Sequence, residues 1–170
     1  MDYIDLLLIH EPSGDVHEIY RAMETAYRDG KLRVIGISNF LESRYSDLAK
    51  HCKVIPAVNQ VETHVFRQQK NLQAIEAQKG TKHESWSPLA CGKNGIFTNQ
   101  TLLGIAQNHG KTVAQIALRF LTQQGIIVIP KSTHIERMKE NLAALDFDLA
   151  VDEMREIEQL EIGQSLFGWW

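Results

Sequence analysis

The chain has 170 residues, of which 44% are hydrophobic and 23% charged, a composition typical of one globular domain with a sizeable core. The formal net charge of −3 offers no basic field to nucleic acid or to an anionic membrane surface, so we expect neither as a partner. The apolar run at residues 6–9 is far too short to span a bilayer and no export signal accompanies it, so we expect a cytoplasmic protein.

Apolar strand-like runs alternate with amphipathic helical stretches along the chain. Strands are expected at residues 3–10, 34–38, 57–62, 83–87 and 126–130. Helices are expected at residues 17–29, 42–51, 68–79, 102–109 and 113–124, and two more, 135–145 and 151–160, close the chain. Apolar strands separated by helices are typical of a parallel sheet covered on both faces, which leaves a doubly wound sheet or a (β/α) barrel.

Polar side chains stand at or just past the carboxyl end of each expected strand. In α/β folds, the groups at these ends converge on the ligand. The pattern therefore predicts a site formed by the ends of several strands: His10, Ser38 with Asn39, Gln60, Ser87, and Lys131 with Ser132.

Most of these positions also have a purely structural interpretation. A lone histidine such as His10 is more often structural than catalytic, although its place at a strand end favours a function. Ser38 and Asn39 could cap the following helix as well as bind a ligand. Gln60, in a strand expected to be buried on both sides, either satisfies its neighbours or holds a ligand amide. Trp86 is either a core residue or a flat surface for a heteroaromatic ring.

The segment IPKSTHIERMKEN contains a predicted helix start. Thr133 and Glu136, three residues apart, fit a capping box, so we expect a helix to begin there. The apolar residues at helical spacing are expected on its buried side: Ile135, Met138 and Leu142.

Two cations flank this helix start. Lys131 lies just ahead of it and Arg137 near its first turn, where both oppose the positive end of the helix dipole. Cations are favourable there if an anion such as a phosphate lies between them. A solvated basic surface explains the spacing equally well.

Cysteines and histidines show no metal-ligand spacing. Cys52 and Cys91 lie far apart and are expected to be reduced thiols. The seven histidines are scattered and none forms an H-E-x-x-H pair. We therefore expect no structural or catalytic metal.

Five segments together resemble the aldo-keto reductase family: DYIDLLLIHEP, GISNF, VNQVE, SWSPL and IPKSTHIERMKEN. They follow the family's order and cover essentially the whole chain. The resemblance implies a (β/α)8 TIM barrel that binds NADPH across the carboxyl ends of its strands and reduces aldehydes or ketones. The first segment resembles the fourth barrel strand. We therefore expect one domain over residues 1–170 that forms part of a barrel, with strands four to eight, their covering helices and two carboxyl-terminal helices.

The resemblance also assigns roles to the residues. His10 is expected to orient the substrate carbonyl, and Trp86 to stack on the nicotinamide ring. Ser38, Asn39 and Gln60 are expected at the nicotinamide carboxamide, and Ser87 and Leu89 along the pyrophosphate. Lys131, Ser132 and Arg137 are expected at the 2′-phosphate, and Glu140 and Asn141 near the adenine. Thr133 is expected as a further cofactor ligand.

The family's proton donor is a tyrosine that works beside a lysine and an aspartate. All three lie on the first three strand units, whereas this chain resembles the family from the fourth onward, and none of its own tyrosines is expected to replace the donor. We expect carbonyl reduction to be impaired in this chain, with a catalytically inactive NADP(H)-binding regulatory module or a gene fragment as the alternatives.

Five strands cannot close an eight-stranded barrel, which typically needs about 250 residues. Although family members are mostly monomeric, we expect the isolated chain to self-associate through its open strand edges. The carboxyl-terminal segment QSLFGWW resembles bacterial diketogluconate-type reductases, which implies small aldehydes, diketones or sugar-derived carbonyls as substrates. Trp169 and Trp170 would contact the substrate or pack against the barrel rim.

Overall fold

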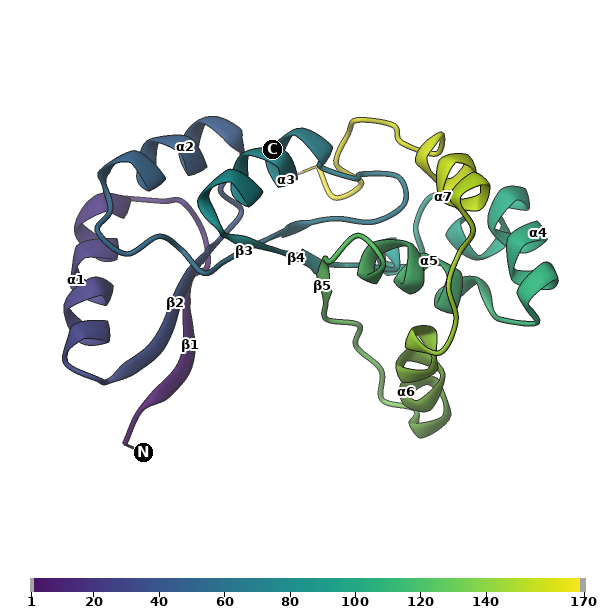
Figure 1. The fold of residues 1–170 in the computed structure, drawn as a ribbon, viewed down its shortest axis with the longest axis horizontal. Helices are drawn as coiled ribbons and strands as arrows, with labels where there is room; N and C mark the ends of the chain where they lie inside the picture. The colour runs from purple at the N-terminus through teal and green to yellow at the C-terminus, as the bar shows by residue number, and fades with distance from the viewer. Residues whose placement is uncertain (1, 169–170) are drawn as a thin grey trace. The chain divides into compact units, whose positions relative to one another are not determined.

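The computed structural model describes residues 2–168 and confirms the expected alternation of strands and helices (Figure 1). The strands are β1 (Ile4–Ile9), β2 (Leu32–Ser38), β3 (Val58–Glu62), β4 (Lys82–Trp86) and β5 (Ile127–Val128). The helices are α1 (Val16–Arg28), α2 (Glu42–His51), α3 (Lys70–Lys79), α4 (Gln100–His109), α5 (Val113–Thr122), α6 (Ile135–Leu142) and α7 (Val151–Glu158). Three short 3-10 helices are η1 (Ala90–Gly92), η2 (Ile96–Thr98) and η3 (Ala143–Leu145).

The five strands form one sheet in the order β1-β2-β3-β4-β5. The pairs β1/β2 and β2/β3 are parallel, and Gly36 of β2 lies opposite Leu8 of β1. A Cβ atom at Gly36 would lie 2.6 Å from Leu8 Cδ2 and 2.8 Å from the Val58 carbonyl oxygen, so only glycine fits this close approach. The α/β class and the parallel sheet are thus as predicted, although β5 spans two residues where five were expected.

The chain divides into two compact units. The first covers residues 1–61 and 70–84. Its helices α1, α2 and α3 lie along the same side of its strands (Figure 1). Apolar side chains of these helices and strands form one core, whose largest fully buried members are Tyr20, Ile35, Ile37, Phe40, Tyr45, Leu48 and Leu72.

The second unit covers residues 62–69 and 85–170. Its core surrounds α5, which begins with a capping box in which Thr112 accepts from the Gln115 N–H and the Gln115 side chain accepts from the Thr112 N–H. Seven of the ten residues of α5 are buried, including Ile116, Leu118 and Phe120, so this helix is the centre of the unit.

Helix α6 differs from its prediction. Its N-cap is His134, without a side-chain cap hydrogen bond, so the predicted capping box of Thr133 is wrong. The local turn is instead made by Ser132, whose Oγ accepts from the His134 N–H at 3.1 Å. The predicted buried face is wrong as well, because its members are strongly exposed: Ile135 by 64%, Met138 by 45% and Leu142 by 71%.

Two general features of the described residues bear on function. Among residues 2–168, no helix combines the length and the apolar character needed to cross a membrane. Cys52 and Cys91 form no disulfide bond within the described residues.

Candidate functional site

In the first unit, the predicted strand-end residues lie together at the carboxyl ends of β1, β2 and β3. The Ser38 hydroxyl donates to the Gln60 carbonyl oxygen at 2.8 Å, and the Asn39 N–H donates to the same oxygen at 2.9 Å. The Asn39 side-chain amide donates to the His10 carbonyl oxygen at 3.2 Å and to Glu11 Oε1 at 3.1 Å. These contacts fix the three strand ends against one another.

The same contacts decide between the alternatives that the sequence left open. The capping interpretation of Ser38 and Asn39 is wrong, because the N-cap of α2 is Leu41, without a side-chain cap bond. Gln60 is half-buried and its amide donates to Glu84 Oε1 at 2.5 Å, so it does satisfy a neighbour. Asn39 has a φ of 63°, and left-handed backbone at a non-glycine residue is typical of functional sites.

The four tyrosines of the chain lie at the opposite, amino-terminal end of these strands. The Tyr45 hydroxyl lies 2.6 Å from the hydroxyl of Thr81, the residue before β4. The Tyr20 hydroxyl donates to a carbonyl in the loop that precedes β3. Tyr3 precedes β1, and Tyr27 lies in the last turn of α1, just ahead of β2. Burial is the main cause that raises the pKa of both Tyr20 and Tyr45, so neither is a ready acid.

In the second unit, a cavity of about 650 Å³ lies between the β5–α6 loop, α5 and the segment after β4. Its volume is in the range of pockets that bind small molecules and cofactors. Seven residues that the sequence analysis assigned to the cofactor line it: Leu89, Lys131, Ser132, Thr133, Arg137, Glu140 and Asn141.

The cavity wall suits an anion. Lys131 and Arg137 supply two cations, and the first turns of α5 and α6 bring the positive ends of two helix dipoles to the same space. The one carboxylate among the lining residues, Glu140, is held by the Thr112 hydroxyl at 2.5 Å. The alternative that Lys131 and Arg137 are only part of a solvated basic surface is therefore less favoured, because both residues line this cavity.

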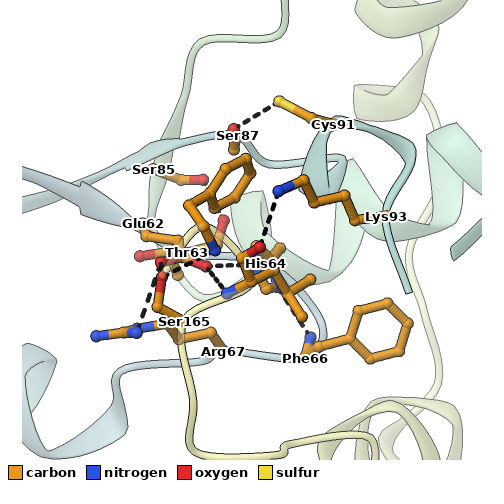
Figure 2. Close-up of polar contacts among 12 residues, drawn as sticks. Glu62, Thr63, His64, Phe66, Arg67, Ser85, Ser87, Cys91, Lys93 and Ser165 are labelled. Carbon is orange, nitrogen blue, oxygen red and sulfur yellow. Dashed lines mark hydrogen bonds and ion pairs between the residues drawn. The ribbon is translucent and has the colours of Figure 1, made fainter. Parts of the chain in front are cut away.

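Trp86 and Ser87 lie outside the residues that line this cavity. Trp86 is half-buried and packs edge-on against Phe167, with ring centroids 5.1 Å apart. The Ser87 hydroxyl lies 3.0 Å from Cys91 Sγ (Figure 2). Ser87, Ala90 and Cys91 all have positive φ. Three such residues within five positions show a strained loop, as is common around bound ligands.

A buried carboxylate holds the carboxyl-terminal segment in the second unit (Figure 2). Glu62 accepts from His64 Nε2 at 3.0 Å, from the Ser165 hydroxyl at 2.5 Å and from the Leu166 N–H at 2.9 Å, and Arg67 lies 3.5 Å away. Burial opposes ionisation, but these hydrogen bonds and the arginine charge outweigh it and lower the pKa of Glu62. The segment that carries Phe167 is thereby tied to the end of β3.

Sequence reasoning missed half of the cavity wall and the whole Glu62 cluster. The missed wall residues are Cys91, Gly92, Phe97, Thr112, Val113, Ala114 and His134. Thr112 with Gln115, ahead of an apolar run, is a capping signal that could have located the start of α5. The expected contacts of Trp169 and Trp170 lie outside the described residues.

The fold and the two groups of residues thus define an α/β protein with a cavity suited to a phosphate-bearing ligand. Residues 1–162 match the aldo/keto reductase family, and the chain belongs to that family. The match confirms the resemblance to this family that the five sequence segments indicated. The family is one of oxidoreductases.

Three relatives illustrate the match. Glyoxal reductase of Bacillus subtilis is 42% identical over 161 residues, which are 94% of this chain and 58% of that protein. Methylglyoxal reductase DkgA of Escherichia coli is 38% identical over 169 residues, 98% of this chain and 62% of that protein. The crystal structure of a Gox0644 variant in complex with NADPH superposes with a TM-score of 0.92 at 34% identity, over 99% of this chain and 62% of that one. The chain therefore spans about three fifths of the length of these relatives.

Proposed function

We propose that this chain binds NADPH and belongs to a carbonyl reductase that transfers hydride to an aldehyde or ketone. In this proposal, residues 1–170 are part of one (β/α)8 barrel and supply its strands four to eight. The observation that carries the proposal is the cavity in the second unit, because seven residues expected on the cofactor from sequence border one space of about 650 Å³.

The cavity residues fit the adenosine end of NADPH. Lys131 and Arg137 would pair with the 2′-phosphate, with Ser132 and Thr133 as hydroxyl donors beside it. Leu89 would line the pyrophosphate. The apolar side chain of Phe97 offers a surface to the adenine, and the polar Glu140 and Asn141 border the same space. A 2′-phosphate is present in NADPH and absent from NADH, so this charge arrangement favours NADPH.

The strand-end residues of the first unit are proposed to hold the nicotinamide carboxamide. Ser38, Asn39 and Gln60 present hydroxyl and amide groups at adjacent strand ends, and His10 stands beside them to orient the substrate carbonyl. Trp86 would stack on the ring and Ser87 would bind the pyrophosphate. When bound, NADPH supplies the hydride that reduces the carbonyl carbon.

In this proposal, none of the tyrosines of these 170 residues donates the proton to the carbonyl oxygen. The hydroxyl groups of Tyr20 and Tyr45 form hydrogen bonds at the amino-terminal end of the strands, whereas His10 lies at the carboxyl end. We therefore expect the chain alone to bind NADPH and to turn over slowly or not at all. The same observation favours a second candidate, an NADP(H)-binding regulatory module without catalysis.

The proposed substrates are small aldehydes and dicarbonyls. The support is the similarity to a glyoxal reductase and a methylglyoxal reductase, both of which act on dicarbonyl compounds by name.

The test is a titration of the purified chain with NADPH and with NADH, followed by tryptophan fluorescence. Saturable quenching that is stronger with NADPH supports the proposal, and a Trp86→Phe variant should lose the quenching while calorimetry still detects binding. Absence of binding by both methods would refute it. NADPH consumption with methylglyoxal then separates a reductase from a regulatory module, which would show none.

A further inference from the structure

Three side chains with metal-binding atoms meet on the first unit, far from the cavity residues in sequence. His17 belongs to α1, and Asp47 and His51 lie four residues apart on α2. One ligand atom from each of the three lies within 4.8 Å of the other two. Scattered histidines gave no expectation of a metal from sequence, because only the packing of α1 against α2 brings His17 to the other two.

Two short contacts join the three groups. His17 Nε2 lies 2.8 Å from Asp47 Oδ2, and His51 Nδ1 lies 3.5 Å from Asp47 Oδ1. His51 Nδ1 also donates to the Asp47 carbonyl oxygen at 2.8 Å, so a metal ion would take Nε2 of this ring or replace that hydrogen bond. The two imidazole rings stand at 88° with centroids 5.5 Å apart, so they approach the carboxylate from different directions. Ligands of a tetrahedral zinc ion at about 2.0–2.2 Å from the metal lie roughly 3.3 Å from one another. His17 and Asp47 already lie near that spacing, whereas the His51 ring would have to turn toward the ion.

A second observation concerns the space beside the histidines. A cavity of about 30 Å³ is lined by His17 and His51 together with Tyr20, Arg21, Glu24, Leu48 and Cys52, and Asp47 is not among its lining residues. A space of this size holds about one water molecule. The two histidines therefore border a space that can hold a water molecule.

The ligand types select the class of metal. Two imidazoles and one carboxylate suit zinc and neighbouring transition metals, whereas calcium and magnesium prefer oxygen ligands alone. We propose that His17, Asp47 and His51 form a binding site for a divalent transition-metal ion such as Zn²⁺, which links α1 to α2. The site is separate from the proposed NADPH residues and does not depend on the proposed function.

The experiment is a calorimetric titration of the full chain with ZnCl₂. We expect saturable binding of one ion per chain and a rise in Tm when the ion is present, because a metal that binds the folded state stabilises it. The ring proton signals of His17 and His51 should shift in NMR spectra during the titration, while those of the buried His64 stay in place.

His51→Gln is the main variant, because His51 is exposed and its replacement should leave the fold intact. We expect at least tenfold weaker zinc binding in His51→Gln and in Asp47→Asn. The control is His134→Gln, which removes an exposed histidine of the second unit and should change zinc affinity less than twofold. Lack of stoichiometric binding by the wild-type chain would overturn the proposal. Equal binding by wild type and by a His51→Gln variant with unchanged Tm in the absence of metal would do so too.

Discussion

Arg137→Met tests the proposed 2′-phosphate site most specifically. Arg137 lies on α6 at the wall of the cavity, and its side chain is exposed, so its loss should not disturb the core. Arginine and methionine have similar helix propensities, so α6 should persist. The expected result is weaker binding of NADPH and unchanged binding of NADH, because only NADPH carries the phosphate.

The magnitude follows from the exposure of the guanidinium group. A hydrogen bond to a charged group contributes about 1.5–3 kcal/mol when it is shielded from water. Solvent reduces the interaction at an exposed position, so we take about 1 kcal/mol for Arg137. This free energy corresponds to a Kd for NADPH that is about fivefold higher.

The assay is isothermal titration calorimetry with both nucleotides at one ionic strength. Lys139→Met is the matched control, because Lys139 lies on the same helix and carries the same charge but pairs with Glu136 at 3.0 Å. We expect this control to change NADPH affinity less than twofold. Equal losses for NADPH and NADH in Arg137→Met, or an equal loss in Lys139→Met, would refute a direct contact with the phosphate.

Three further predictions concern stability, each measured by urea unfolding. Gly36→Ala should cost about 1–3 kcal/mol, because its Cβ would be forced against Leu8 and the Val58 carbonyl; an unchanged midpoint would contradict the close approach. The lowered pKa of Glu62 stabilises the folded chain above the ordinary value of 4.5, and this stability is lost as pH falls through the folded-state pKa, so Glu62→Gln should flatten the acid side of the stability profile. Burial raises the pKa of Tyr20 above its ordinary 10.0, so stability should fall as pH rises beyond that value, and less steeply in Tyr20→Phe; identical alkaline profiles would exclude this cause.

The strand-end residues could be predicted because a parallel sheet brings the carboxyl ends of its strands to one edge. Once strands were predicted at residues 3–10, 34–38 and 57–62, the proximity of His10, Asn39 and Gln60 followed from the fold class alone. What Ser38 and Asn39 bond to could not be predicted, because capping and strand-to-strand bonding place the same residue types at the same positions.

Contacts between distant residues were the main source of missed features. Glu62 and Ser165 are 103 positions apart, and no local pattern connects them. The periodicity of α6 correctly predicted a helix with one apolar face, but periodicity does not show whether another element covers that face, and here it is exposed. The wall that α5 contributes to the cavity depends in the same way on packing rather than on spacing.

Binding of adenosine 2′,5′-bisphosphate to the chain tests the central claim most directly, because this compound carries the end of NADPH assigned to the cavity and nothing else. We would measure it by calorimetry beside adenosine 5′-monophosphate. The account predicts saturable binding of the bisphosphate with at least tenfold higher affinity than the monophosphate, and loss of this preference in a variant that lacks both Lys131 and Arg137. No binding of the bisphosphate, or equal affinity for the two compounds, would contradict the assignment of the cavity.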